Sequence, residues 1–231
     1  AKAPPDGYTL LSATPQVAIV QSMVKELTFD PRRDLAPVSL VGVIPNMLVV
    51  ESSRGQKSLR DLVAFAKANQ GKLNYSSTGA GTAVHLSAEL FKAEAGVDIV
   101  GIPYKGAAPA LTAVVARQVD MIVITASSVM PYAKSGKLKV LAVASARPSV
   151  LAPGVPTTQE AGMPGFESAT VHALFAPART PERTVARLNQ EVTQYLTQPE
   201  IREKLLGLGL EVVANTPAQL GATVRSEMER I

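Results

Sequence analysis

The chain has 231 residues, of which 46% are apolar and 18% charged, a composition typical of a globular protein with one large core or two smaller ones. It contains no cysteine and two histidines, which excludes thiol chemistry and zinc sites built from cysteine and histidine. The net charge of +4 comes from scattered lysines and arginines, and no apolar run approaches the ~20 residues of a bilayer span, so neither nucleic acid nor insertion into a membrane is expected.

Strand and helix signals alternate through the first 144 residues. Apolar runs bounded by turn residues predict strands over Tyr8–Leu11, Val38–Val43, Met47–Val50, Leu73–Tyr75, Val97–Ile102, Asp120–Ile124 and Leu138–Ala144. Apolar residues at helical spacing predict helices from Pro15 to about Lys25, from an N-cap at Ser58 to Gly71, over Thr82–Ala95, over Ala107–Arg117, and from about Ser128 to Lys134. Such alternation with short loops is typical of a parallel sheet with right-handed crossovers.

The alternation breaks at Ala146–Gly165, a segment rich in proline and glycine that we interpret as a surface connection. Beyond it, the sequence predicts a strand over Val171–Ala176, a helix beginning at Thr180-Pro181-Glu182, a helix from Pro199, a strand over Leu210–Val213 and a last helix from Thr216-Pro217. No internal repeat accompanies these elements.

The stretch NYSSTGAGTAVHL, Asn74–Leu86, places serine, threonine and glycine between a strand and a helix. Two more short loops, Tyr104–Ala107 and Thr125–Ser128, follow the next two predicted strands in the same way. Ligands of open parallel sheets bind beyond the carboxyl ends of the strands, where helix N-termini present unpaired N–H groups and a positive dipole end. The three loops therefore predict an anion site built mainly from backbone.

The nucleotide-binding motifs fail at their diagnostic positions. Gly79–Val84 has valine where the dinucleotide fingerprint needs its third glycine, and Asp98 lies near the start of the next strand instead of its end. Gly101–Gly106 has the glycine spacing of a phosphate loop but continues with Ala107-Ala108 in place of lysine and serine or threonine. Neither G-x-S-x-G nor H-E-x-x-H is present, so the sequence indicates no catalytic residue, cofactor or metal.

Three side chains near these loops have competing interpretations. We interpret His85, just inside the helix after the glycine loop, as a capping or packing residue in preference to a ligand contact, and His172 as structural. For Lys105 two interpretations stay open: a cation that pairs with a bound carboxylate, and a solvated loop lysine.

Five stretches of the sequence resemble, in order, those of one family. They read PDGYTLLSAT, LTFDPRRDLAPVSLVG, GKLNYSSTGAGTAVHLSAELFKAEAGVDIVGIPYKGAAPAL, VPTTQEAGMPGFE and LFAPARTPERTVARLN. Together they extend over nearly the whole chain and resemble the substrate-binding proteins of tripartite tricarboxylate transporters, also called the Bug family. The NYSSTGAGTAVHL and PYKGAAPAL blocks are the most specific.

The resemblance implies an α/β fold of the type II periplasmic-binding-protein kind, with two domains that each contain a mostly parallel sheet flanked by helices. The first domain is expected at residues 1–50 plus 169–231 and the second at 51–168. The implied function is capture of a small carboxylate between the domains, which close like a clamshell, for delivery to the membrane subunits of the transporter. A periplasmic monomer without enzymatic activity or cofactor is expected, with its signal peptide outside this sequence.

The family's binding loops carry over to both domains. The implied ligand-binding residues are Thr14 and Gln16 in the first domain, and Ser77, Thr78, Gly79, Gly81, Thr82, Lys105, Gly106, Ala107, Thr125 and Ala126 in the second. Family members usually have a strand, loop and helix before PDGYTLL and continue past the last helix, so part of the site is expected outside this sequence. Val171 stands where an aromatic residue is common. Two alternatives stay open: a clamshell sensor of an organic acid and, less favoured, a nucleotide-binding α/β enzyme.

Overall fold

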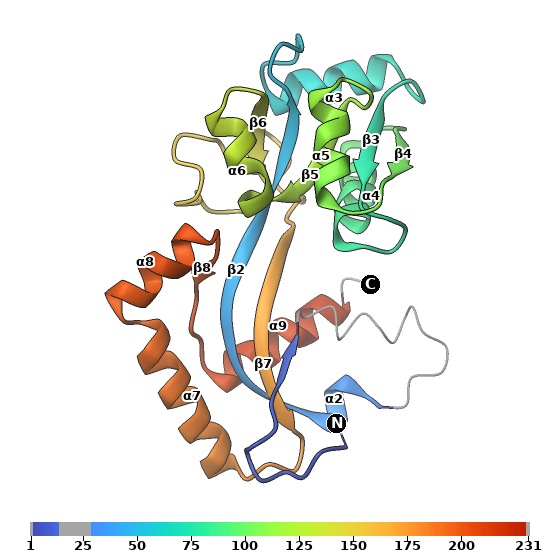
Figure 1. The fold of residues 1–231 in the computed structure, drawn as a ribbon. Helices are drawn as coiled ribbons and strands as arrows, with labels where there is room; N and C mark the ends of the chain where they lie inside the picture. The colour runs from blue at the N-terminus through green and yellow to red at the C-terminus, as the bar shows by residue number, and fades with distance from the viewer. Residues whose placement is uncertain (1, 14–28, 230–231) are drawn as a thin grey trace. The chain divides into compact units, whose positions relative to one another are not determined.

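The computed structural model describes residues 2–13 and 29–229 (Figure 1). The chain divides into two compact units: unit 1 comprises residues 1–43 and 171–231, and unit 2 comprises residues 44–170. Two long strands belong to both units, because β2 (Leu35–Glu51) carries the chain into unit 2 and β7 (Ala169–Pro177) carries it back. None of the described helices is long and apolar enough to cross a membrane.

Unit 2 contains a mixed sheet. Its strands follow the order β6 (Leu138–Val143), β2, β5 (Met121–Thr125), β3 (Asn74–Ser77) and β4 (Val100–Pro103). Strand β3 runs parallel to both β4 and β5, whereas β2 is antiparallel to β5 and β6. The three parallel neighbours therefore all end at the same edge of the sheet.

Helices cover both faces of the unit 2 sheet. They are α3 (Leu59–Ala68), α4 (Ala83–Ala95), α5 (Ala107–Val115) and α6 (Ala126–Lys134). Residues of α3 and α4 form one apolar cluster with Met121 and Val123, and residues of α5 and α6 form another with Ile122 and Ile124. Strand β5 is thus buried on both faces, as its uninterrupted apolar sequence predicts. The predicted α/β fold class is confirmed.

Two helix ends in unit 2 follow the sequence signals and one does not. Helix α3 begins at a capping box, in which Ser58 Oγ accepts from the Asp61 N–H at 3.1 Å and the Asp61 carboxylate accepts from the Ser58 N–H at 3.0 Å. Helix α4 ends at Gly96, whose φ of 62° is the left-handed value that favours glycine. Helix α3, however, ends at Asn69, whose N–H bonds to the Ala66 carbonyl before the predicted Gly71 is reached.

Strand β2 is continuous where the sequence predicted two strands separated by Pro45-Asn46. Gly42 and Val43 pair with β8 (Glu211–Val212), and from Asn46 onward the strand pairs with β5. Because Pro45 lies between these two sets of pairs, its missing N–H interrupts neither ladder. One strand can therefore serve both units.

Unit 1 differs from the expected mostly parallel sheet. Its remaining elements are β1 (Leu11–Ala13), α2 (Pro31–Asp34), α7 (Glu182–Leu196), α8 (Pro199–Gly207) and α9 (Pro217–Glu229). Strand β1 is antiparallel to β7, and β8 is antiparallel to β2. Strand β2 leaves this unit and β7 returns to it, so the two long strands run in opposite directions. Each of them also pairs with an antiparallel neighbour, β8 and β1.

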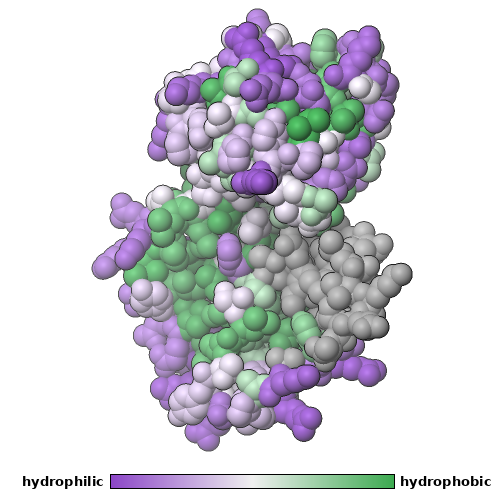
Figure 2. All heavy atoms as spheres, turned by 45° about the vertical axis from the view of Figure 1, so that its right-hand side comes forward, coloured by the Kyte–Doolittle hydropathy of each residue, from purple (hydrophilic) through white to green (hydrophobic). Residues whose placement is uncertain are grey.

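The first strand begins later than predicted, and the core of unit 1 is small. Tyr8 was predicted to start a strand, but its N–H bonds to the Asp6 carboxylate at 3.0 Å in a local turn. The buried apolar cluster contains Leu35, Leu40, Ala173, Phe175, Leu220 and Val224. Apolar side chains also gather on the surface of unit 1, the lower half of Figure 2. In the same unit, Val41, Leu174 and Val192 help to line a groove of about 390 Å³.

Candidate ligand-binding site

The carboxyl ends of β3, β4 and β5 form one edge of the unit 2 sheet. Ser77 of β3 lies opposite Pro103 of β4, and the Tyr104 N–H donates to the Ser77 carbonyl at 2.8 Å. Strand β3 leads into α4, β4 into α5 and β5 into α6 (Figure 1). We call residues 77–82, 104–107 and 125–128 at this edge the loop edge. Three helices begin there, and each brings N–H groups without an intrahelical partner and the positive end of a dipole.

The glycine loop before α4 is held in shape by its own threonines. Thr82 is the N-cap: its Oγ1 accepts from the His85 N–H at 3.3 Å and donates to the Gly79 carbonyl at 2.8 Å. Thr78 Oγ1 lies 3.0 Å from Thr82 Oγ1. Gly79 and Gly81 have φ values of 122° and 74°, which L side chains rarely adopt. The sequence thus specifies a tight turn whose backbone is open to close approach.

The loop before α5 leaves its helix N-terminus uncapped by any side chain. Gly106 is the N-cap residue, with φ 106° and ψ 177°, a region that is essentially restricted to glycine. A Cβ built at Gly106 would meet no heavy atom within 4 Å, so there is room beside this backbone. Pro109 in the first turn lacks an N–H. The N–H groups of Ala107 and Ala108 are therefore the backbone donors that this helix start offers.

Helix α6 begins directly at the end of β5. Thr125 is both the last strand residue and the N-cap, and no side-chain hydrogen bond caps the helix. The Thr125 hydroxyl instead lies 3.0 Å from the Ser128 hydroxyl, and Ser127 Oγ lies 3.4 Å from it. This helix start therefore combines backbone N–H groups that no described side chain caps with a group of hydroxyls.

The structure brings ten of the twelve predicted site residues to the loop edge. They are Ser77, Thr78, Gly79, Gly81, Thr82, Lys105, Gly106, Ala107, Thr125 and Ala126. Two of them are buried, since Ser77 and Ala126 are 2% and 0% exposed. Lys105 is exposed, and no described carboxylate forms an ion pair with it. Thr14 and Gln16 lie outside the described residues.

Two polar side chains at this edge were not among the predicted site residues. Ser76, one residue before the end of β3, is fully buried, and its Oγ has no hydrogen-bond partner among the described residues. His85 was interpreted as a capping or packing residue, and its Nδ1 accepts from the Gly81 N–H at 3.4 Å. The contact between Gly81 and His85 could have been predicted from their spacing of four residues, which is one helical turn. No feature of the sequence indicates that Ser76 belongs to the site.

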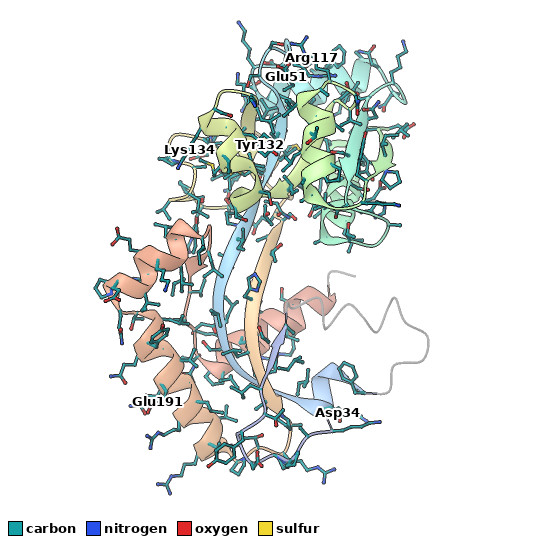
Figure 3. All side chains as sticks on the ribbon, viewed as in Figure 1. Asp34, Glu51, Arg117, Tyr132, Lys134 and Glu191 are labelled. Atoms are coloured by element: carbon teal, nitrogen blue, oxygen red, sulfur yellow. The ribbon has the colours of Figure 1, made fainter. Side chains whose placement is uncertain are left out.

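The three loops of the loop edge contain no acidic residue: none of residues 77–82, 104–107 and 125–128 is aspartate or glutamate. At the opposite edge, where β3 and β5 begin, Asp120 pairs with Arg54 and accepts from the Asn74 N–H. Glu51 at the end of β2 pairs with Arg117 at 3.0 Å (Figure 3). Hydrogen bonds from Ser53, together with the Arg117 charge, lower the pKa of Glu51 and outweigh the opposing effect of burial. An anion at the loop edge therefore meets no carboxylate from the loops.

The carboxylate of Glu89, in the middle of α4, is neutralised by its own partners. It accepts from the Tyr75 hydroxyl at 2.6 Å and from the Lys92 ammonium at 3.2 Å. Burial opposes the ionisation of Glu89, but the hydrogen bonds from Tyr75 and Lys92 outweigh it and lower the pKa of the carboxyl. Burial and the same carboxylate raise the pKa of the Tyr75 hydroxyl. Among the described residues, no group of three histidine, aspartate or glutamate side chains could hold a metal ion.

Comparison with known proteins identifies the family. The model of the tripartite tricarboxylate transporter family receptor, TctC, matches residues 1–231. The chain belongs to this receptor family. The resemblance seen in the sequence is thereby confirmed, and proteins of the family are periplasmic solute-binding receptors.

Individual members of the receptor family support the assignment. The protein BugT of Bordetella pertussis is 32% identical to this chain, over all of the chain and 71% of its own length. The structure of Rpa4515 from R. palustris with adipate has a TM-score of 0.83 and 33% identity over 99% of this chain and 77% of its own. MatC from Rhodopseudomonas palustris with bound malate has a TM-score of 0.77 and 32% identity over 99% of this chain and 79% of its own.

Proposed function

We propose that the protein captures a small carboxylate and delivers it to the membrane subunits of a tripartite tricarboxylate transporter. The observation that carries the proposal is the loop edge, where three helices begin and none of the loop residues is acidic. Solved relatives with adipate and malate, both dicarboxylates, support the ligand class. The protein acts in the periplasm as a monomer, without catalysis and without a cofactor.

In this proposal each loop has a distinct role. The N–H groups of Gly79 and Gly81 receive one carboxylate, because the small residues let its oxygens approach the backbone. Thr82 holds the turn through its bonds to the Gly79 carbonyl. The first-turn N–H groups after Gly106 and the hydroxyl of Thr125 contribute further donors. Lys105 adds a positive charge that is not bound to a carboxylate of the described chain. The remaining predicted contacts, Ser77, Thr78, Ala107 and Ala126 from unit 2 and Thr14 and Gln16 from the first domain, complete the proposed site.

A ligand panel tests the proposal directly. Adipate and malate are expected to stabilise the protein, whereas NAD and ATP are expected to leave it unchanged, since both nucleotide fingerprints are broken. At about one hundred times Kd a ligand adds ~2.7 kcal/mol to the free energy of unfolding. For a chain of this length that is a rise of roughly 5–10 °C in Tm, measured by differential scanning fluorimetry and confirmed by calorimetry.

The neutral diester dimethyl adipate is the matched control for this panel. It keeps the carbon chain of adipate but lacks the anionic oxygens, so no shift in Tm is expected. Stabilisation by a nucleotide in the absence of any organic acid effect would contradict the proposal. An equal response to adipate and its diester would mean that carboxylates are not what the site recognises.

The proposed capture mechanism is clamshell closure of two domains, residues 1–50 with 169–231 and residues 51–168. A charge-assisted hydrogen bond contributes ~1.5–3 kcal/mol, so two bonds made only in the closed state give ~3–6 kcal/mol of differential binding. About 5.5 kcal/mol moves a population from 1:99 to 99:1. The chain segments near residues 50–52 and 168–170 would act as the hinge.

Small-angle scattering tests the closure. The radius of gyration is expected to fall when a saturating organic acid from the panel is added, while the circular dichroism spectrum stays the same. NAD at the same concentration serves as the control and is expected to have no effect. If calorimetry shows saturation and the scattering profile nevertheless stays unchanged, ligand is held by a static site and closure is excluded.

A further inference from the structure

The imidazole of His85 lies against the glycine loop. The ring belongs to the first turn of α4, four residues after Gly81, and its Nδ1 accepts from the Gly81 N–H at 3.4 Å. The backbone of the same residue is fixed independently, because the His85 N–H donates to the N-cap oxygen of Thr82 at 3.3 Å. The side chain is half-buried, so solvent or a ligand reaches it.

This contact places a nitrogen acceptor at one of the donors that a carboxylate would use. An Nδ1 that accepts a hydrogen bond carries no proton, so the neutral ring holds its proton on Nε2. Its N···N distance of 3.4 Å is long for a hydrogen bond. A carboxylate oxygen forms shorter and stronger bonds with backbone N–H groups than a neutral acceptor does. The anion is therefore the better partner for the Gly81 N–H.

The geometry points to a displaceable role for His85, an inference that rests on the proposed function. In the ligand-free protein His85 Nδ1 occupies the acceptor position at the Gly81 amide, and a carboxylate oxygen of the ligand takes that position and releases the ring. His85 thus competes with the ligand for this amide and keeps the amide hydrogen-bonded until ligand arrives. No proton or covalent bond is transferred in the exchange.

The loop does not depend on His85 for its shape. Thr82 Oγ1 donates to the Gly79 carbonyl at 2.8 Å, and Thr78 Oγ1 lies 3.0 Å from the same hydroxyl. Removal of the ring therefore leaves the turn in place and removes a competitor for the ligand. This fixes the sign of the expected effect: a variant without an acceptor at position 85 binds carboxylate more tightly than the wild type.

Calorimetry on the full chain, with adipate and malate as ligands, tests whether removal of the His85 acceptor raises or lowers the affinity. His85→Leu, which removes the acceptor, is expected to bind the acids about two- to fivefold more tightly, the size expected for loss of one weak hydrogen bond. His85→Asn places an amide oxygen near the former Nδ1 position and is expected to return the affinity toward that of the wild type. A loss of affinity in His85→Leu would make the ring a direct ligand contact and would overturn the inference.

Nitrogen NMR supplies a readout that a structural role alone would not change. The chain has only two histidines, so His172 in β7 serves as the internal reference. At pH 8 without ligand, His85 Nδ1 is expected to give the signal of an unprotonated, hydrogen-bonded nitrogen, which shifts on saturation with adipate or malate. A protonated Nδ1 in the free protein overturns the inference whatever binds.

The two proposals fail in different ways. Binding of either acid with an unchanged His85 signal overturns the displacement by His85 and leaves the proposed function intact. Failure of both acids to bind the wild-type chain overturns the proposed carboxylate capture, and with it the displacement.

Discussion

Replacement of Gly106 by valine is expected to weaken the binding of adipate or malate about thirtyfold, a loss of ~2 kcal/mol. Gly106 has φ 106° and ψ 177°, where a β-branched residue is strained by ~1–3 kcal/mol. In the wild type, this backbone directs the first N–H groups of α5 at the loop edge. The valine variant would relieve its strain by rotating the backbone, and the N–H groups would then no longer point at the ligand. The new side chain would also enter space that is open around this residue in the protein. Isothermal calorimetry measures the loss.

Gly136→Val is the matched control for this variant. Gly136 follows the C-terminus of α6, has φ 72°, and a Cβ there would also meet no heavy atom within 4 Å. The control variant is expected to lose stability through the same kind of backbone strain while it binds the acids as the wild type does. If Gly106→Val keeps its affinity within about threefold, or ~0.7 kcal/mol, the start of α5 is not part of the anion site.

The loop edge could be predicted from the sequence because its causes are local. Short loops join each strand to the next helix, so parallel strands must place the three loops at one edge. The residues that shape the loops, such as Gly81, Thr82 and Gly106, are also visible as residue types with known conformational preferences. The structure accordingly brings these predicted positions together.

The strand directions of unit 1 could not be predicted in the same way, since they depend on contacts between distant residues. Pro45 breaks the apolar pattern locally, but the strand continues because its neighbours pair with β8 on one side and β5 on the other. The antiparallel pairing of β1 with β7 joins Ser12 to Leu174, a contact that neither local sequence indicates. Local propensity carries no information about such partners.

The exposure of individual side chains at the site could not be predicted from the sequence. Ser77 and Thr78 look alike in the sequence, yet the first is buried at the end of β3 and only the second is partly exposed. The contact between His85 and Gly81 likewise depends on how the turn folds back on the helix. Residue type predicted which backbone would be open, but the accessibility of each side chain needed the folded strand and helix.

Replacement of Asn46 by alanine is expected to lower the free energy of unfolding by about 2–4 kcal/mol, from two lost hydrogen bonds and two hydroxyls left with fewer partners. Asn46 is 3% exposed, and its Nδ2 donates to Ser87 Oγ at 3.0 Å and to Ser168 Oγ at 2.8 Å. The two hydroxyls lie 2.6 Å apart. This network joins α4, which begins at the glycine loop, to the two chain segments that connect the units.

The size of this effect depends on burial, so the proper control is an asparagine whose hydrogen bond is exposed to water. Asn69 Nδ2 donates to the Phe65 carbonyl at 2.9 Å at the exposed end of α3, and Asn69→Ala is expected to cost less than about 1 kcal/mol because water replaces the lost partner. Urea unfolding monitored by circular dichroism compares both variants with the wild type.

Ser168→Ala and the double variant complete a double-mutant cycle. The coupling free energy between Asn46 and Ser168 is expected to be about 0.5–3 kcal/mol, as for residues in one hydrogen-bond network. Additive effects, or equal costs at positions 46 and 69, would mean that the network does not fix α4 to the connecting strands, and that α4 is held by the apolar contacts of Phe91 and its neighbours alone.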